Sequence, residues 1–354
     1  MLKNKYSVLG LMSGTSLDGL DIIHVTLGYD GIWDFNIHAA ETIPYQKDWK
    51  YQLANLTSKS KEELKDIDES FTNYLAEHIN SFISKNAIAD IDFISSHGHT
   101  ALHQPSEGLT YQIGNLNHLA TLTGHTVVCD FRVQDVQIGG QGAPLVPIGD
   151  HYLFSNYNYC LNLGGFANLS TNKSGIRIAY DICPVNIVLN HYVSQLGHDY
   201  DDKGKIAKEG TINSQMLEQL NALDFYQQSY PKSLGLEWVE MTIFPIIDSY
   251  KLSVQDILKT FVEHIADQIS DETIGNNTCS VLVTGGGAYN DYLISRLQAK
   301  SQNQITIPSK TIIEFKEALI FSLLGVLKIR DEVNCLASVT GASRDHSSGI
   351  IFQP

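Results

Sequence analysis

One order of secondary structure occurs twice along this 354-residue chain, and this repeat restricts the possible folds more than any other feature. In the first copy, β-branched runs predict three strands at residues 6–11, 20–27 and 33–42. An apolar helical face then predicts a helix at 60–82, followed by a strand at 92–96, a helix at 116–123 and a strand at 125–129. In the second copy, the same patterns predict strands over 157–163, 167–171, 175–180, 279–284 and 304–307, with helices between the last three. Such self-similarity indicates internal duplication, and the length is sufficient for two α/β domains.

A loop rich in glycine and hydroxyl groups separates the first two predicted strands. It reads Ser13-Gly14-Thr15-Ser16-Leu17-Asp18-Gly19-Leu20-Asp21. Glycines allow backbone N–H groups to approach an anion, hydroxyls donate to phosphate oxygens, and the two aspartates offer oxygen ligands to a divalent cation. No lysine follows the glycines and a strand comes next, which excludes a Walker-type loop and argues against a dinucleotide-binding loop. An ordinary hairpin turn is the other interpretation of this stretch.

Glycine turns also follow two predicted strands of the second copy. Gly164-Gly165 occupies the place that the first loop has in the first copy, and Gly285-Gly286-Gly287 lies between a strand and a helix. We expect two similar domains of the actin-like ATPase (ribonuclease H-like) fold, facing across a cleft for ATP and substrate. The predicted domains are 1–132, completed by the tail 335–354, and 133–334. The glycine-rich stretch 139–147 is interpreted as a hinge or a ligand-facing loop.

Composition and charge exclude several classes of protein. The net charge is −15 and no run of Lys and Arg occurs, so a nucleic-acid partner is not expected. Five cysteines without CxxC spacing predict neither a disulfide framework nor a zinc site. The N-terminal residues lack the apolar stretch of a signal peptide, and no apolar run reaches membrane-spanning length. We therefore expect a cytoplasmic protein with no membrane association.

Motifs along nearly the whole chain resemble those of the anhydro-N-acetylmuramic acid kinases. They lie, in chain order, at residues 9–21, 96–105, 112–114, 130–135, 139–147, 162–168, 285–290, 316–318 and 339–342. The resemblance implies an ATP-dependent kinase that hydrolytically opens the 1,6-anhydro ring of anhydro-N-acetylmuramic acid and phosphorylates O6. The product would be N-acetylmuramic acid 6-phosphate, within the recycling of bacterial peptidoglycan. The resemblance also suggests a homodimer.

The resemblance places the ATP loop on residues 14–21 and the general base on Asp181. The predicted nucleotide-binding residues are Gly14, Thr15, Ser16, Leu17, Asp18, Gly19, Leu20, Asp21, Gly164, Gly165, Gly285, Gly286 and Gly287. Asp18 is also the predicted partner of Mg²⁺, either directly or through water. Because an anhydro sugar has no free 6-hydroxyl, the base would activate a water that attacks the anomeric carbon. Taken alone, Asp181 is also a typical helix N-cap ahead of Pro184.

Four further residues are predicted to bind the sugar: Ser13, His97, Arg132 and Glu317. The planar guanidinium of Arg132 suits the lactyl carboxylate of a muramic acid, although an ion pair with Asp130 or Asp135 would also explain it. Glu317 lies within an apolar helical pattern, where an unpaired buried charge would be unfavourable, so we expect it to face the site.

Two stretches depart from the family pattern. The predicted base is followed by Ile182-Cys183-Pro184-Val185-Asn186, where the family usually has Thr-Gly-Pro-Gly-Asn, and His99 stands where glutamine is usual. We interpret His99 and Cys183 as local packing differences in a divergent member. The departures leave two alternatives open, namely a kinase or phosphohydrolase of the same fold acting on a different sugar, or a nucleotide-driven actin-like ATPase.

Overall fold

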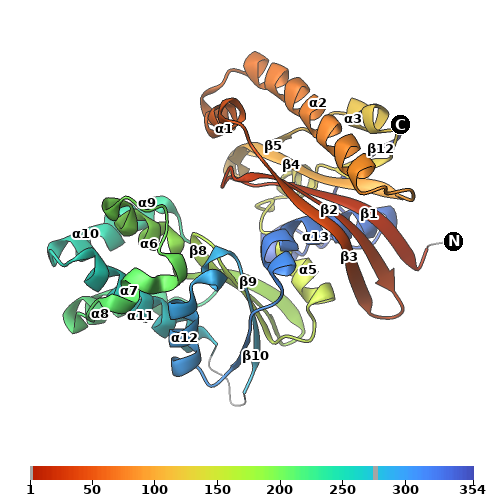
Figure 1. The fold of residues 1–354 in the computed structure, drawn as a ribbon. Helices are drawn as coiled ribbons and strands as arrows, with labels where there is room; N and C mark the ends of the chain where they lie inside the picture. Colours follow the sequence, from red (N-terminus) through yellow and green to blue (C-terminus); the bar gives the residue numbers. More distant parts are fainter. Residues whose placement is uncertain (1–2, 274–277) are drawn as a thin grey trace. The chain divides into compact units, whose positions relative to one another are not determined.

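The computed structural model in Figure 1 describes residues 3–273 and 278–354. The chain forms two compact units, each with its own sheet and its own hydrophobic core. The first unit contains the residues up to Leu153 together with Phe315–Pro354, and the second is Phe154–Glu314. No helix in the described part of the chain has the length and apolar character needed to cross a bilayer.

A seven-stranded sheet organises the first unit. Its strands are β1 (Lys5–Ser13), β2 (Gly19–Tyr29), β3 (Trp33–Pro44), β4 (Phe93–Gln104), β5 (Leu109–Ile113), β6 (Val127–Cys129) and β12 (Ile350–Phe352). They follow the order β12-β6-β4-β1-β2-β3, and β5 pairs with β4. β1, β2 and β3 form an antiparallel meander, whereas β4 runs parallel to β1 and β6 parallel to β4. The five strands predicted for the first copy are therefore present as β1, β2, β3, β4 and β6, whereas β5 and β12 were not predicted.

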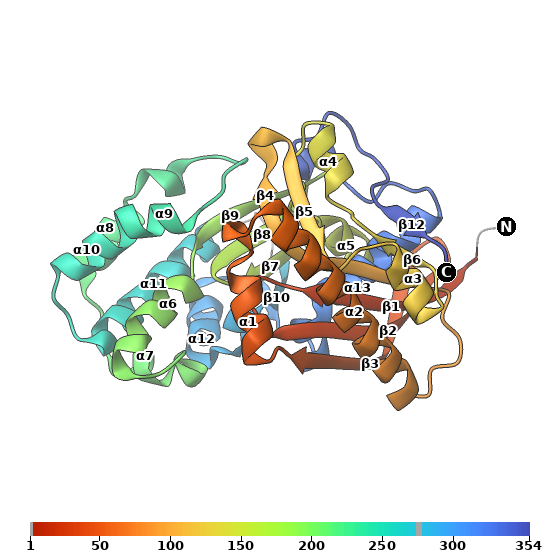
Figure 2. The same ribbon diagram turned by 90° about the horizontal axis from the view of Figure 1, so that it is seen from above.

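Helices cover both faces of this sheet (Figures 1 and 2). The helices of this unit are α1 (Lys47–Ala54), α2 (Lys61–Lys85), α3 (His118–Thr123), α4 (Val133–Gln137), α5 (Val146–Leu153), α13 (Lys310–Ile329) and α14 (Ala337–Thr340). The predicted capping box begins α2, because the Ser60 side chain accepts from the Glu63 N–H and the Glu63 carboxylate accepts from the Ser60 N–H. The apolar face of α2 then packs on β1 and β2 in one core.

α13 packs on the sheet through small residues. A Cβ on Gly10 of β1 would lie 2.5 Å from the carbonyl oxygen of Ala318, so only glycine allows the helix backbone this close to the strand. Ser95 of β4 donates its hydroxyl to the carbonyl oxygen of Phe321 at 2.6 Å. These contacts attach α13, which is remote in sequence, to the centre of the first sheet.

The second unit repeats the arrangement. Its strands are β7 (Tyr159–Leu163), β8 (Phe166–Lys173), β9 (Ile176–Pro184), β10 (Ser280–Thr284) and β11 (Gln304–Thr306), in the order β11-β10-β7-β8-β9. Its helices are α6 (Asn186–Val193), α7 (Lys205–Glu209), α8 (Ser214–Asn221), α9 (Leu236–Trp238), α10 (Phe244–Ser249), α11 (Val254–Glu272) and α12 (Asp291–Lys300). β7, β8 and β9 are antiparallel, and β10 and β11 continue the sheet in parallel.

The two sheets share one topology. The series β3-β2-β1-β4-β6 of the first unit corresponds to β9-β8-β7-β10-β11 of the second, with the same strand directions. A three-stranded antiparallel meander extended by two parallel strands is the ribonuclease H-like arrangement, and its duplication within one chain is the actin-like ATPase fold. The predicted fold class and the predicted duplication are confirmed.

The limits of the two units differ from the predicted domains, which meet at 132/133 and 334/335. Both α5 and most of α13 belong to the first unit, where a Cβ on Gly149 would touch Ile320 and Lys316 forms an ion pair with Asp150 at 2.7 Å. Periodicity shows that a helix has an apolar face but not which sheet covers it. β12 in the tail pairs with β6 of the first unit.

Candidate active site

The predicted nucleotide loop is a short connection in the first unit. Residues 14–18 join β1 to β2, and the Leu17 N–H donates to the Gly14 carbonyl at 3.3 Å. Thr15, Ser16 and Asp18 are exposed, so their hydroxyls and carboxylate face solvent. The loop thus presents the polar groups that the sequence suggested for binding phosphates and a cation.

The last three residues of the predicted loop lie in β2 rather than in the connection. Gly19 packs against β3, since a Cβ there would lie 2.4 Å from the Ile43 carbonyl oxygen. Leu20 is buried in the core, and Asp21 is half-buried and accepts a hydrogen bond from the Thr42 hydroxyl at 2.6 Å. Gly19, Leu20 and Asp21 therefore fix the end of the loop to the sheet, while residues 14–18 form the part of the loop that ligands can reach.

Ser13 ends β1 inside a buried hydrogen-bond network. Its hydroxyl lies 2.6 Å from the Tyr45 hydroxyl and 2.7 Å from His99 Nδ1. Ser13 and His99 are partners on the parallel strands β1 and β4, which explains their contact. Burial lowers the pKa of His99 to about 4, so its imidazole is neutral at pH 7. His99 is therefore a partner of Ser13 rather than a charged group of the site.

His97 is also buried, and both of its ring nitrogens have partners. Nδ1 lies 2.9 Å from the Gly98 carbonyl oxygen, and Arg132 Nε donates to Nε2 at 2.9 Å. Together these contacts require the tautomer with hydrogen on Nδ1. Burial and the adjacent guanidinium keep the pKa of His97 well below 6.5, so the ring stays a neutral acceptor. His97 positions Arg132, and its direct contact with a sugar stays a prediction.

Arg132 is half-buried, and its guanidinium is held in place by neutral groups. Besides His97, it donates from Nη1 to the Gly142 carbonyl oxygen at 2.5 Å and lies 5.8 Å from the ring centre of Phe321. Among the described residues, Arg132 forms no ion pair with Asp130 or Asp135, the alternative that the sequence left open. Its positive charge is available to an anionic ligand.

Glu317 of α13 supplies a negative charge near this guanidinium. Its side chain is accessible to solvent, whereas the adjacent Lys316 is buried and paired with Asp150. Desolvation of its carboxyl group raises the pKa of Glu317, and the positive charges of Arg132 and Lys316 offset part of this rise. Arg132 and Glu317 are thus close enough to influence each other electrostatically, and their contact with a sugar stays a prediction.

In the second unit, three polar side chains form a row across three strands. Asn162 of β7 faces Asn168 of β8, which in turn faces Asp181 of β9. Asn162 Nδ2 donates to Asn168 Oδ1 at 3.4 Å, and Asn168 Nδ2 donates to Asp181 Oδ1. Asp181 Oδ2 accepts a second bond from the Leu234 N–H at 2.8 Å. The predicted base is therefore oriented from two sides.

A β-bulge brings Asp181 into this row. Ala167 pairs with Cys183 but Asn168 pairs with Asp181, so Ile182 is an extra residue on β9. Burial raises the pKa of Asp181 above its ordinary value of 3.8, and the bonds from Leu234 and Asn168 counteract part of this rise. The N-cap alternative is wrong, because α6 starts at Asn186 after the N-cap residue Val185. The Asp181 carboxylate instead accepts hydrogen bonds from Asn168 and Leu234, which lie outside α6.

The glycine turns of the second unit gather at the same edge of its sheet. The carbonyl of Gly165 accepts from the N–H groups of Val185 (2.8 Å) and Ile187 (3.3 Å), which connects the β7–β8 turn to the start of α6. Gly285 has φ of 80°, and a Cβ there would lie 2.6 Å from Asn162 Oδ1. Glycine is required at Gly285 so that the β10 turn can pack against the end of β7.

The comparisons with known proteins agree over almost the entire chain. The family model described as anhydro-N-acetylmuramic acid kinase matches residues 6–354. The anhydro-N-acetylmuramic acid kinase of Aliivibrio fischeri is 34% identical over 97% of this chain and 98% of its own length, and that of Vibrio cholerae is 33% identical over 98% of both. The chain belongs to the anhydro-N-acetylmuramic acid kinase family. The predicted family and the predicted class of enzyme, an ATP-dependent sugar kinase, are confirmed.

One solved structure illustrates a weak overall similarity to this member of the anhydro-N-acetylmuramic acid kinase family. The activator of the 2-hydroxyisocaproyl-CoA dehydratase from Clostridium difficile, with bound ADPNP, has a TM-score of 0.45 and 14% identity over 92% of this chain and 96% of its own. The fold assignment rests instead on the strand order and directions of the two sheets.

The departures from the anhydro-N-acetylmuramic acid kinase pattern lie in the core. Ile182, Cys183 and Val185 are buried among the apolar residues of the second unit. Burial raises the pKa of the Cys183 thiol, which makes it a poor nucleophile. The environments of Cys183 and His99 therefore agree with their interpretation as packing differences.

Four residues that form hydrogen bonds with the predicted site residues or with each other were not themselves predicted: Tyr45, Asn162, Asn168 and Leu234. A signal for two of them exists, since Asn162 and Asn168 are equally distant from Gly165 and must face each other in a hairpin. Tyr45 and Leu234 reach the site through tertiary contacts that no local pattern contains.

Proposed function

We propose that this chain phosphorylates anhydro-N-acetylmuramic acid at O6 with ATP while water opens the 1,6-anhydro bond, giving N-acetylmuramic acid 6-phosphate and ADP. The family assignment supports the substrate. The observation that best supports the reaction is the environment of Asp181. Its carboxylate is half-buried, is oriented by Asn168 and Leu234, and lies beside the glycine turns of the second sheet.

In the proposed reaction, Asp181 takes a proton from a water molecule. The water oxygen bonds to the anomeric carbon, the bond from that carbon to O6 breaks, and O6 bonds to the γ-phosphorus as its bond to the bridging oxygen of ADP breaks. A base works best when its pKa approaches the working pH, so the raised pKa of Asp181 favours this role. A positioned base contributes about 10²–10⁴-fold to the rate.

The first unit would bind the charged parts of the ligands. Arg132, oriented by His97, suits a carboxylate through its planar fork of donors, and the nearby Glu317 suits sugar hydroxyls or the amide N–H. The exposed hydroxyls of residues 14–18 suit phosphate oxygens. Asp18, an exposed carboxylate on this loop, fits Mg²⁺, which prefers oxygen ligands and would neutralise charge on the phosphates.

The test is turnover with purified protein in water enriched in ¹⁸O. We expect ADP release that requires the anhydro sugar, and a sugar 6-phosphate that gains one ¹⁸O on the sugar and none on the phosphate. Asp181→Asn should slow this turnover by about 10²–10⁴-fold, and Asp199→Asn, which changes an exposed carboxylate of the same unit, should leave it unchanged. ADP release without sugar would indicate an actin-like ATPase, and turnover on another sugar alone would indicate a redirected kinase.

We also propose that the protein is a cytoplasmic homodimer, as the family resemblance suggests. Light scattering coupled to size-exclusion chromatography measures the mass directly. A mass of twice 39.3 kDa would support the dimer, and a mass of 39.3 kDa would contradict it.

A further inference from the structure

Three buried side chains with metal-binding atoms converge in the first unit, outside the site described above. They are Asp135 of α4, Cys335 after α13, and His346 in the tail, and their ligand atoms all lie within 4.8 Å of one another. Cys335 and His346 form an antiparallel bridge with N–H···O bonds of 3.1 and 3.2 Å, which places them directly opposite each other. The exposed fractions are 0% for Asp135, 1% for Cys335 and 6% for His346.

His346 carries a buried ring nitrogen for which the described residues provide no hydrogen-bond partner. Its Nδ1 lies 3.2 Å from the Arg344 carbonyl oxygen, whereas Nε2 is buried and has no such partner. The nearest carboxylate atom, Asp135 Oδ1, is 3.6 Å away, which is too long for a hydrogen bond. Buried polar atoms in native proteins almost always have a hydrogen-bond or metal partner. We therefore expect a group outside the described residues to bind this nitrogen.

We propose that Asp135, Cys335 and His346 bind a zinc ion. A thiolate, an imidazole and a carboxylate are the three ligand types that Zn²⁺ takes in proteins, whereas Mg²⁺ and Ca²⁺ prefer oxygen alone. The ion would give His346 Nε2 its missing partner and would balance the buried charge of Asp135. A water molecule or the buried Ser348 hydroxyl would complete a tetrahedral set.

The surroundings of Asp135 match those of a metal-ligating carboxylate. Its Oδ2 accepts from the Gly142 N–H and its Oδ1 from the Thr340 hydroxyl, both at 2.7 Å, which fixes the orientation of the group. The Gly142 carbonyl in turn accepts from Arg132. The zinc ion would thus hold the tail against the loop that positions Arg132, and its role would be structural.

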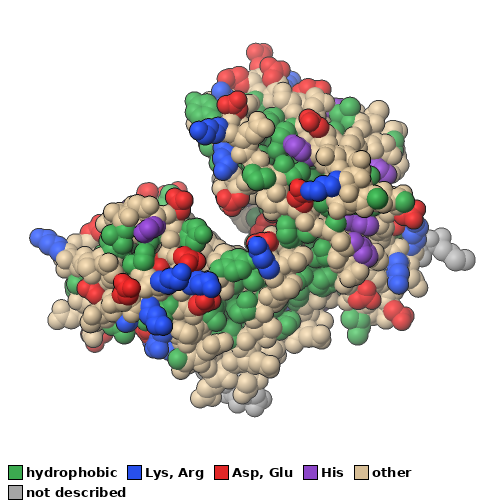
Figure 3. All heavy atoms as spheres, viewed as in Figure 1, with side chains coloured by type: hydrophobic (Ala, Val, Ile, Leu, Met, Phe, Trp, Pro, Cys, Tyr) green, Lys and Arg blue, Asp and Glu red, His purple; other side chains and the backbone are tan. Residues whose placement is uncertain are grey.

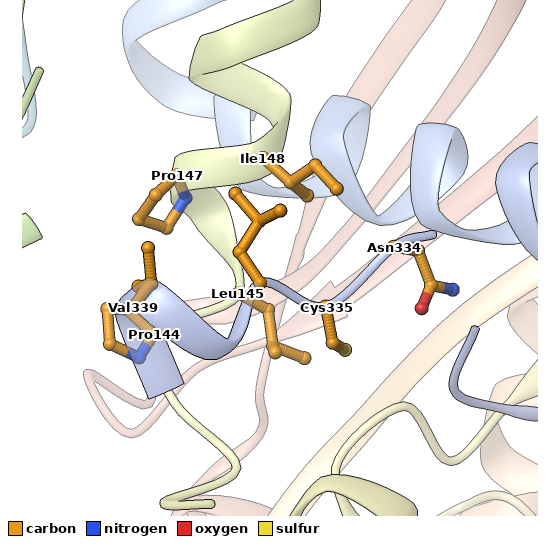
Figure 4. A pocket seen from close by; sticks show the side chains of 8 residues that line it. Pro144, Leu145, Pro147, Ile148, Asn334, Cys335 and Val339 are labelled. Atoms are coloured by element: carbon orange, nitrogen blue, oxygen red, sulfur yellow. The ribbon is translucent and has the colours of Figure 1, made fainter. Parts of the chain in front are cut away.

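Apolar side chains limit the access of water on one side of the cluster. Cys335 lines a small pocket together with Leu145, Ile148 and Val339, and Figure 4 shows Leu145 beside it. Such a hydrophobic wall excludes competing water ligands from a thiolate–metal bond. Sequence spacing did not indicate this site, because Asp135 is 200 residues from Cys335 and the chain has no CxxC motif.

The test uses untagged, full-length protein kept reduced and stripped of metal by a chelator. Zn²⁺ is titrated in competition with a chromophoric chelator, and Co²⁺ is added separately to detect the near-ultraviolet charge-transfer band of a cobalt–thiolate bond. We expect one tight site per chain and a clear thiolate band. Cys335→Ser should remove the band, and both Cys335→Ser and His346→Gln should weaken zinc binding by about 100-fold or more.

Cys279→Ser, a matched change outside the cluster, should retain the band and the zinc affinity, and excess Mg²⁺ should not displace the zinc. A wild-type protein whose cobalt form lacks the thiolate band would overturn the proposal, even if the variants do not fold. Zinc binding of equal strength in wild type, Cys335→Ser and His346→Gln would also overturn it, since the metal would then sit on other side chains.

Discussion

At the scale of single residues, Asp181 provides the sharpest test of mechanism. Asp181→Asn should reduce kcat by about 10²–10⁴-fold, because the amide cannot accept a proton from water. Steady-state kinetics measure the loss, and circular dichroism checks that the fold is retained. A loss no larger than that of Asp199→Asn would contradict the role of Asp181 as the base.

The pH profile follows from the direction of the shift at Asp181. A base acts in its deprotonated form, so kcat/KM should fall as the pH decreases through the pKa of Asp181, and burial places this midpoint above 3.8. The acidic limb of the profile, measured where the protein stays folded, should disappear in the residual activity of Asp181→Asn. An unchanged acidic limb in that variant would assign the titration to another group.

His97 should act through Arg132 rather than on the sugar. His97→Ala removes an acceptor of the guanidinium and should raise KM for the anhydro sugar roughly 5–30-fold, the equivalent of about 1–2 kcal/mol, with a smaller effect on kcat. The decisive measurement is a double-mutant cycle, since the effect should largely vanish in an Arg132→Lys background. Additive effects would show that His97 contacts the substrate independently.

At the scale of elements, Gly10 determines how α13 packs. Gly10→Ala would place a methyl group against the Ala318 carbonyl and should destabilise the first unit by about 1–3 kcal/mol, measured by urea unfolding. Gly14→Ala is the matched control, because the nearest atom to its added Cβ lies at 3.7 Å. Equal stability of both variants would mean that α13 can shift away from β1 at little cost.

At the scale of the whole molecule, the second unit is one continuous segment, whereas the first unit combines two. We expect residues 154–314 alone to fold and to unfold cooperatively, because this segment contains a complete sheet, its helices and a core. Residues 1–153 alone should not fold stably, since they lack α13. Thermal melts followed by circular dichroism test both, and a non-cooperative melt of 154–314 would contradict the first expectation.

Charge is distributed without segregation on the face shown in Figure 3, where acidic and basic side chains are interspersed over both units.

The repeated order of strands and helices, the capping box of α2 and the positions of the glycine turns could be predicted from the sequence, because each depends on neighbouring residues or on a local period. The family motifs likewise identified Asp181, Arg132 and Glu317 as candidates. Tertiary structure alone decided the bulge at Ile182 that aligns Asp181 with Asn168. Tertiary structure alone also determined that α13 packs on the first sheet and that Asp135 lies close to His346. These features depend on register and on contacts between distant segments, which no local pattern of residues encodes.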